Sequence, residues 1–158
     1  MVKVLFVCLG NICRSPTAHA LFQAAVNKAQ LEQRIQIDSA GTGGWHSGSP
    51  PDQRAQKTAL AHGYDMSHLQ ARQVHIDDFS SFDYILAMDH QNLQDLKAIA
   101  PANYHGVLGL FLTQSGIDRA EEVPDPYYGG DEQFEYAIGL VKEGVDGLLE
   151  RIRQQHKL

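Results

Sequence analysis

The sequence is poor in cysteine, in positive charge and in long apolar runs. With only Cys8 and Cys13 among 158 residues, it cannot build the disulfide framework of small secreted proteins. Its 13 Lys and Arg residues against 19 Asp and Glu residues give a formal net charge of −6. That balance argues against a general nucleic-acid binder, which needs a basic surface. An anionic ligand must therefore be attracted by a local positive site.

Metal and nucleotide motifs are also absent. The eight His residues show no His-x3-His spacing, and the two cysteines do not form a Cys-x2-Cys pair, so we expect no metal site. The glycine-rich segment 41–44 is not a dinucleotide fingerprint, and no Walker-type Gly-Lys-Ser/Thr occurs. The N-terminal apolar run is too short for a secretory signal or a membrane span. We expect a cytoplasmic protein that uses no cofactor.

Strand patterns and helix patterns alternate along the chain. Apolar or alternating segments predict strands at 2–7, 34–39, 82–88 and 106–112. Helical patterns follow at 15–29, 52–62, 89–99 and 134–152, with Ser15 and Asp89 as expected N-caps. This order indicates βαβ units and a mostly parallel sheet covered on both faces. The absence of repeats and linkers predicts one domain over residues 1–158.

Cys8 and Arg14 bracket a short loop between the first strand and the first helix. Such a loop can direct its N–H groups at a tetrahedral oxyanion, and the following helix points its positive end at the same place. A thiol pKa falls from about 8.5 to roughly 3.5–7.5 beside a helix N-terminus or a cation. The planar fork of Arg14 suits two phosphate oxygens. The loop therefore predicts a phosphatase that works through a phosphocysteine on Cys8. A lone Cys in such a strand, without Arg14 nearby, would instead be interpreted as a buried packing residue.

Two residues inside this loop have open roles. Asn11 lies mid-loop, and because Asn tolerates positive φ better than most residues, we expect a structural role. Cys13 is near enough to Cys8 for a reversible disulfide that would protect the thiolate from further oxidation. Cys13 is equally suited to be a small packing residue, and the sequence favours neither alternative.

A proton donor for the leaving group is expected far along the chain. Asp125 is the best candidate, because Pro124 and Pro126 restrict its backbone and can hold its carboxyl group in place. From local sequence alone it is equally a turn residue. Nearby aromatic side chains, Tyr127 and Tyr128 together with Trp45, suit the walls of a pocket for an aromatic leaving group or act as partial lids.

Taken together, these segments resemble the low-molecular-weight protein tyrosine phosphatase family. Besides residues 4–16, the resemblance includes segments 38–40, 49–52, 66–68, 71–73, 82–86, 88–89 and 125–129. It implies a four-stranded parallel twisted sheet of flavodoxin-like topology between helices on both faces. It also implies hydrolysis of protein phosphotyrosine and small aryl phosphates without a metal, with Cys8 as nucleophile, Arg14 as phosphate binder and Asp125 as general acid.

The resemblance assigns further residues to the same site. The loop that holds the phosphate would comprise Leu9, Gly10, Asn11, Ile12, Cys13 and Arg14. A hydrogen-bond network of Asn11, Ser15, Ser39 and His68 would support this loop and the Cys8 thiolate. Leu9 and Ile12 would contact the substrate ring, with Trp45, Tyr127 and Tyr128 at the pocket rim.

Three other functions remain as alternatives. An arsenate reductase on the same scaffold needs further cysteines than this chain has. A phosphocysteine carrier domain must preserve its phosphocysteine, whereas Arg14 and Asp125 favour turnover. A module that only binds phosphotyrosine would not need Cys8. The expected partners are phosphotyrosine-containing proteins, and the sequence leaves open whether a weak homodimer forms.

Overall fold

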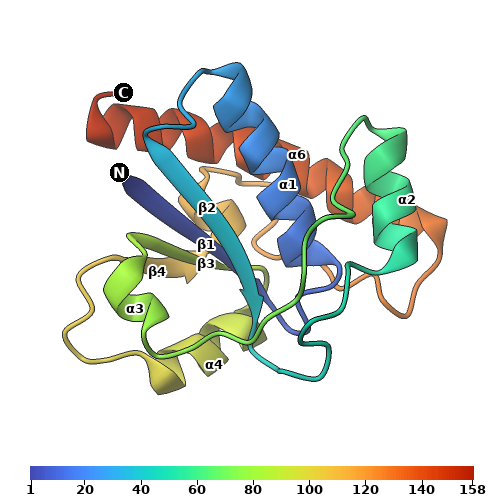
Figure 1. Cartoon of the computed structure of the whole chain (residues 1–158), viewed down its shortest axis with the longest axis horizontal. Coiled ribbons are helices and arrows are strands. Elements are labelled where there is room, and N and C mark those ends of the chain that lie inside the picture. The colour runs from blue at the N-terminus through green and yellow to red at the C-terminus, as the bar shows by residue number, and fades with distance from the viewer.

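A four-stranded parallel sheet forms the centre of the structure. The computed structural model describes residues 1–158, and its strands lie in the order β2-β1-β3-β4 (Figure 1). Their bounds are β1 Val2–Cys8, β2 Ile35–Gly41, β3 Tyr84–Ala87 and β4 Val107–Leu110. The helices are α1 Arg14–Lys28, α2 Gln53–Ala61, α3 Asp78–Ser81, α4 His90–Ile99, α5 Phe111–Gln114 and α6 Asp131–His156. The predicted α/β class and flavodoxin-like order are confirmed.

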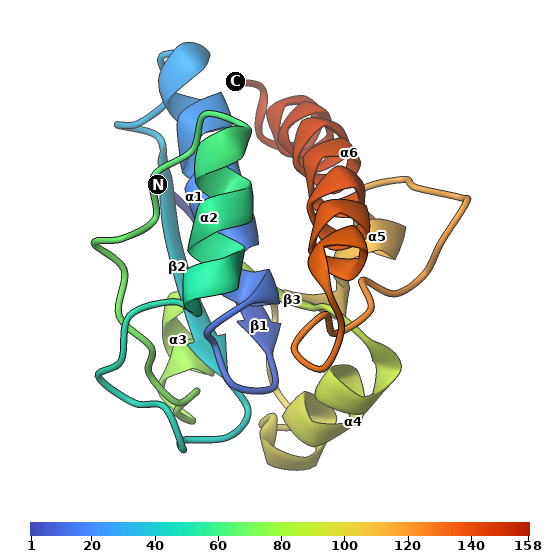
Figure 2. The same cartoon turned by 90° about the vertical axis from the view of Figure 1, so that its right-hand side faces the viewer.

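Helices cover both faces of this sheet. In Figures 1 and 2, α1 and α6 lie on its upper side, and α3 and α4 lie on its lower side. The alternation of β1 divides its side chains between two cores: Phe6 faces the larger core with α1 and α6, whereas Leu5 and Val7 face the smaller core with Phe79 and Leu96. Because both faces of β1 are buried from Val4 onward, residues 4–8 form a continuous apolar run, with Lys3 before them.

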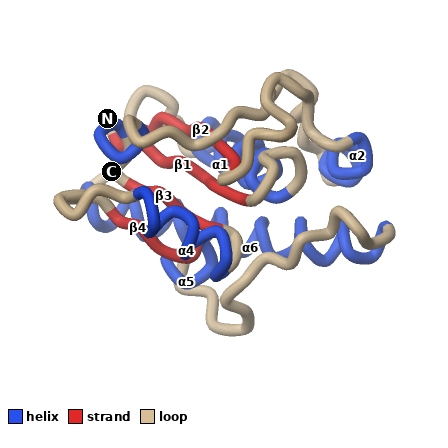
Figure 3. The backbone as a smooth tube through the Cα atoms, turned by 90° about the horizontal axis from the view of Figure 1, so that it is seen from below, coloured by secondary structure: helices blue, strands red, loops and turns tan.

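Helix α2 lies outside the sheet. Figure 3 shows it beyond the ends of the strands, beside the N-terminal half of α6. It buries only Ala55 and Ala59, and Asp52 caps it by accepting hydrogen bonds from the N–H groups of Arg54 and Ala55. The expected start of a helix near Asp52 is confirmed. Asp52 also connects α2 to the loop between Cys8 and Arg14, because its own N–H donates to the carbonyl of Ile12 at 2.8 Å.

Several expected boundaries differ from the structure. Strand β2 continues to Gly41 rather than ending at Ser39, and β3 begins at Tyr84 rather than Phe82. Two further differences have a clear physical reason. Ser15 was expected to cap the first helix, but α1 begins at Arg14, its N-cap residue is Cys13, and no side chain caps it. The hydroxyl of Ser15 faces inward to Cys8 instead. The fourth strand was expected to reach residue 112, but it ends at Leu110, opposite the last residue of β3. Without a partner strand beyond that point, Phe111 turns into α5 and packs in the larger core.

The longest helix, α6, contains glycines where α5 approaches it. A side chain at Gly144 would stand 2.4 Å from the ring of Phe111, and one at Gly147 would stand 2.1 Å from the carbonyl oxygen of Ser115. Glycine at these two positions lowers the helix propensity of α6 but allows α5 to pack closely against it. None of the helices combines the length and the apolar character needed to cross a bilayer.

Candidate active site

The loop between Cys8 and Arg14 leaves its main-chain N–H groups without protein acceptors. Its carbonyls face outward: Cys8 O accepts from the N–H of Thr42, Leu9 O from Gly43 and Ile12 O from Asp52, at 2.8–2.9 Å. None of the main-chain N–H groups from Leu9 to Ser15 donates to a protein acceptor. Since unpaired N–H groups converging at a helix N-terminus attract anions, this loop has the form of an oxyanion cradle.

Asn11 supplies the turn that this cradle needs. Its φ of 57° lies in the left-handed region, as its place in the sequence suggested. Gly41 at the end of β2 makes room for the loop, because a side chain there would stand 2.8 Å from the carbonyl oxygen of Leu9. The local sequence and the close approach of β2 therefore shape the loop together.

The sulfur of Cys8 is buried at the base of the loop. Its Sγ lies 3.0 Å from the hydroxyl of Ser15, which also receives a hydrogen bond from the amide of Asn11 at 2.7 Å. Of the expected supporting residues, Ser15 thus contacts the thiol directly, and Asn11 acts on it through Ser15. A hydroxyl beside sulfur stabilises a thiolate more than a thiol, because a charged acceptor makes the stronger hydrogen bond.

The expected place of His68 in this network is wrong. His68 is exposed and makes no hydrogen bond, whereas Ser39 pairs with Nδ1 of His19 at 3.0 Å. Burial lowers the pKa of His19, and the nearby His68 acts in the same direction, so the pair with Ser39 involves a neutral imidazole at neutral pH. A sequence signal existed: His19 is four residues after Ser15, so both lie on the same face of α1.

The side chain of Arg14 is held in place by Asp89, a residue that was expected only to cap a helix. Its Nη1 donates to Asp89 Oδ2 at 2.7 Å and to the carbonyl of Val123 at 2.9 Å, and its side chain is 2% exposed. Burial alone would lower the pKa of Arg14, but the neighbouring Cys8, Asp89 and Asp125 outweigh it and raise that pKa above its usual value. The guanidinium is therefore a permanent cation beside the loop.

Asp125 reaches the same place from a distant part of the chain. Its Oδ2 lies 3.6 Å from Nη2 of Arg14, and its Oδ1 accepts the N–H of Tyr127 at 3.1 Å. With 36% of its side chain exposed, the carboxyl group is open to the pocket and to solvent. The structure thus brings Cys8, Arg14 and Asp125 together, although Asp125 is more than a hundred residues from the loop.

The loop opens into a pocket of about 300 Å³. Its lining residues are Cys8, Leu9, Gly10, Ile12, Cys13, Arg14, Trp45, His46, Asp125, Tyr127 and Tyr128. Trp45 and Tyr128 are 73% and 94% exposed, which places them at the rim, and the rings of Tyr127 and Tyr128 meet edge to face at 4.9 Å. Every expected rim residue lines this pocket, and His46 is one that the sequence analysis missed.

A second missed residue, Arg54, supports one wall of the pocket. Its guanidinium lies 5.2 Å from the ring centroid of Tyr127 and pairs with Asp52 at 3.0 Å. Because Asp52 also binds the carbonyl of Ile12, one chain of contacts joins the loop to the aromatic wall. The sequence offered a partial signal, since an Arg two residues after an N-cap Asp is well placed to pair with it.

Cys13 differs from Cys8 in its surroundings. Burial, followed by the nearby carboxylate of Asp52, raises the pKa of the Cys13 thiol far above its usual value. Both cysteines are free thiols.

No group of three or more His, Cys, Asp or Glu side chains is arranged to hold a metal ion.

Comparison with known proteins identifies this combination of fold and loop. The family model for the low molecular weight phosphotyrosine protein phosphatases matches residues 3–158. The chain belongs to this family. The family membership confirms the resemblance that the sequence indicated, and with it the expectation of an enzyme of the protein-tyrosine-phosphatase class.

Relatives of the chain include proteins from distant organisms. The low molecular weight protein-tyrosine-phosphatase YfkJ of Bacillus subtilis is 42% identical over 158 residues, which are 100% of both chains. A protein tyrosine phosphatase from Entamoeba histolytica, solved with Hepes in its active site, has a TM-score of 0.93 at 36% identity and 100% coverage of both chains. The arginine phosphatase DARP of Drosophila has a TM-score of 0.87 at 34% identity and 99% coverage of both.

Proposed function

We propose that the chain hydrolyses phosphotyrosine in proteins, and small aryl phosphates, through a phosphocysteine on Cys8. The observation that carries this proposal is the loop itself. Cys8, the buried Arg14 and loop residues whose N–H groups have no protein acceptor line the same pocket. Together they match the needs of phosphoryl transfer: a nucleophile, donors for the equatorial oxygens and a fixed positive charge.

In the first step, the Cys8 thiolate attacks phosphorus in line with the leaving oxygen. An S–P bond forms while the P–O bond to the phenol breaks, and protonated Asp125 gives its proton to the departing phenolate. Arg14 and the loop N–H groups stabilise the charge on the three equatorial oxygens. The position of Asp125 beside Nη2 of Arg14 at 3.6 Å supports its role as the donor.

In the second step, water replaces the sulfur. The Asp125 carboxylate takes a proton from this water as its oxygen bonds to phosphorus, and the S–P bond breaks to return the Cys8 thiolate and release inorganic phosphate. One carboxyl group therefore serves as acid and then as base. Its partial exposure, with 36% of the side chain accessible, supports access of water to the pocket.

The pocket walls support an aromatic leaving group. Leu9, Ile12 and Trp45 with the tyrosine pair at 127–128 surround the opening with apolar and aromatic surface. Such walls suit a planar phenyl ring. One similar structure is an arginine phosphatase, so the leaving group needs a direct test. The guanidinium part of a phosphoarginine side chain would find one carboxylate on the pocket walls, that of Asp125.

The experiment follows the fate of phosphorus. A phosphotyrosine peptide labelled with ³²P is mixed with the enzyme, quenched in acid within milliseconds and analysed by mass spectrometry. We expect a phosphorylated peptide that contains Cys8, whose amount falls as inorganic phosphate appears. A Cys8→Ser variant is expected to bind the peptide but to release no phosphate.

Substrate competition tests the chemical class. With phosphotyrosine and phosphoarginine peptides of the same sequence, we expect higher kcat/KM on phosphotyrosine. A preference for phosphoarginine would replace the proposed substrate. Turnover by Cys8→Ser would overturn the mechanism.

Two further measurements test the alternative functions. Release of phosphate without a protein acceptor would exclude a phosphocysteine carrier. Failure to reduce arsenate with thioredoxin would exclude the arsenate reductase.

A further inference from the structure

A chain of hydrogen bonds reaches Cys8 from a segment more than sixty residues away. The main-chain N–H of Arg72 donates to Oδ1 of Asn11 at 3.0 Å, and Nδ2 of Asn11 donates to the hydroxyl of Ser15 at 2.7 Å. The same hydroxyl lies 3.0 Å from the sulfur of Cys8. All the inner members of this chain are buried: Asn11, Ser15 and Cys8 are each 2% exposed or less.

The donor-to-acceptor direction of these hydrogen bonds is determined at Arg72. A main-chain N–H can only donate, so the oxygen and not the nitrogen of the Asn11 amide must face Arg72. The amide NH₂ then faces Ser15 and occupies the hydroxyl oxygen as an acceptor. The single hydroxyl proton is left for Cys8 at 3.0 Å or for the carbonyl of Ala40 at 3.4 Å, and a thiolate at the shorter distance is the stronger acceptor.

The reversed amide would have the opposite effect on the sulfur. If the Asn11 NH₂ faced Arg72, two donors, this NH₂ and the main-chain N–H of Arg72, would point at each other. Both would then be unpaired in a buried place. The Asn11 oxygen would then accept the Ser15 proton and draw it away from Cys8. The N–H of Arg72 therefore decides where the Ser15 proton points.

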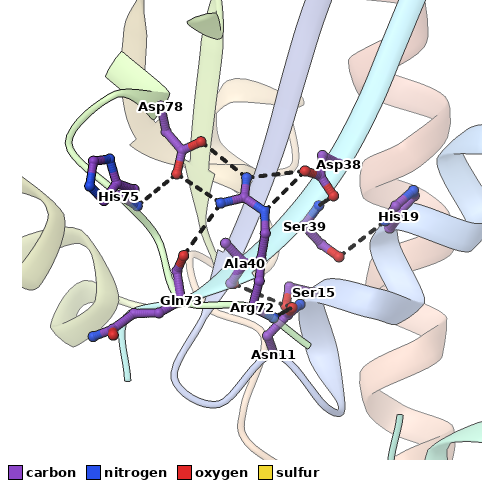
Figure 4. A network of polar contacts seen from close by, with 10 residues as sticks. All are labelled: Asn11, Ser15, His19, Asp38, Ser39, Ala40, Arg72, Gln73, His75 and Asp78. Atoms are coloured by element: carbon purple, nitrogen blue, oxygen red, sulfur yellow. Dashed lines mark hydrogen bonds and ion pairs between the residues drawn. The ribbon is translucent and has the colours of Figure 1, made fainter. Parts of the chain in front are cut away.

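The side chain of Arg72 holds this N–H in place. Its guanidinium lies between two carboxylates: Asp78 accepts from Nη1 at 3.0 Å and Nη2 at 3.1 Å, and Asp38 accepts from Nε at 3.1 Å (Figure 4). Asp38 belongs to β2 and Asp78 begins α3. Main-chain bonds to Gly41, at 2.8 Å on either side, attach the same segment to the end of β2.

Loss of the guanidinium would disturb this arrangement. Asp78 is buried, and besides Arg72 only the N–H of His75 donates to its carboxylate. A buried carboxylate without its cation is strongly unfavourable. The segment from Arg72 to Asp78 would therefore shift to expose that charge, and the N–H that holds Asn11 would move with it.

We propose that Arg72 is a positioning residue of the reaction: clamped by Asp38 and Asp78, it orients the Asn11 amide and so directs the Ser15 hydroxyl proton at the Cys8 sulfur. The proposal rests on the proposed function of Cys8 as the nucleophile. Arg72 touches neither the pocket nor the sulfur, and it acts only through Asn11 and Ser15.

The test measures the thiolate without any turnover. The rate at which iodoacetamide alkylates Cys8 is followed between pH 4 and pH 9 in the wild type and in Arg72→Ala. We expect the midpoint of this profile to rise by about one pH unit, which is about tenfold less thiolate below the midpoint. The kcat/KM on an aryl phosphate should fall about tenfold at pH values below the wild-type midpoint and recover above the new midpoint.

Two controls separate positioning from general damage. Arg119→Ala removes another guanidinium that pairs with a carboxylate, Glu143, but lies outside the pocket and the hydrogen-bond chain, and it should leave the midpoint unchanged. In a Ser15→Ala background, where the last donor is missing, Arg72→Ala should cause no further shift, because coupled residues are not additive.

Two results would overturn the proposal. One is an unchanged midpoint in folded Arg72→Ala, and the other is an equal shift with and without Ser15. If Arg72→Ala does not fold, Asp78→Asn takes its place, with a smaller upward shift expected and the same two criteria. Because alkylation needs no substrate, these outcomes are independent of whether Cys8→Ser retains turnover, which is the result that would overturn the proposed function.

Discussion

Asp89 binds Arg14 with one carboxylate oxygen and caps helix α4 with the other. Oδ2 accepts from Arg14 Nη1 at 2.7 Å, and Oδ1 accepts from the N–H of Asn92 at 2.7 Å. This contact joins the ends of β1 and β3, the point where the strand order reverses and where such sheets bind ligands. One side chain therefore starts a helix and aims the cation of the active site.

We expect Asp89→Ala to lose both stability and activity. Loss of the cap costs about 1 kcal/mol of unfolding free energy, and the buried Arg14 loses its charged partner. Asp89→Asn keeps an acceptor for the helix, so it should regain most of the stability and little of the activity. Urea unfolding and kcat/KM on an aryl phosphate measure the two effects. Equal activity in both variants and the wild type would contradict the role of Asp89 in aiming Arg14.

Asp125→Asn is expected to slow turnover by about 10²–10⁴-fold, because it removes the proton donor. The loss should be largest for phenyl phosphate and smallest for p-nitrophenyl phosphate, whose leaving group needs little protonation. Steady-state kcat on a series of aryl phosphates checks this. Asp118→Asn, an exposed carboxylate in the preceding loop, is the matched control. A loss independent of the leaving group would contradict the assignment as general acid.

The two cysteines should differ in reactivity. Because burial raises the pKa of Cys13, we expect iodoacetamide at pH 7 to label only Cys8. Mass spectrometry of digested protein should show one labelled site in the wild type and none in Cys8→Ser. The prediction is wrong if native Cys8→Ser takes up label on Cys13.

His19 should make the fold less stable in acid. Burial lowers its pKa in the folded state, so between that value and the unfolded value of about 6.5 the unfolded chain binds more protons. Stability is therefore fully present above about pH 6.5 and is lost as the pH falls through the folded pKa. We expect His19→Gln to flatten this part of the profile of unfolding free energy.

Urea unfolding from pH 5 to pH 8 measures the effect of His19→Gln. His105→Gln, a change at an exposed histidine, should keep the wild-type slope. An unchanged slope in His19→Gln would show that protonation of this residue does not govern the acid loss.

Local patterns were sufficient for the four strands, the four longer helices and the loop, but not for the short helices α3 and α5. The apolar run of β1, the Asp caps before α2 and α4 and the spacing of Cys8 and Arg14 involve residues near one another in the chain. Such features depend on short-range sterics, capping and burial pattern, which a sequence displays directly. Ser15 was misread because a helix N-terminal hydroxyl has two uses, capping and binding a neighbour, and both look the same in sequence.

Tertiary packing determines which distant side chains pair with the residues around the loop. Whether His19 or His68 meets Ser39 depends on how α1 and the segment after α2 lie against β2, and the interpretation from sequence chose wrongly. The clamp of Arg72 between Asp38 and Asp78 likewise needs β2 and α3 to converge. The order of the strands and longer helices, and the short loop between Cys8 and Arg14, follow from local sequence. Which distant side chains fix that loop was decided only when the sheet brought its strand ends together, because hydrogen bonds require atoms within about 3 Å of one another.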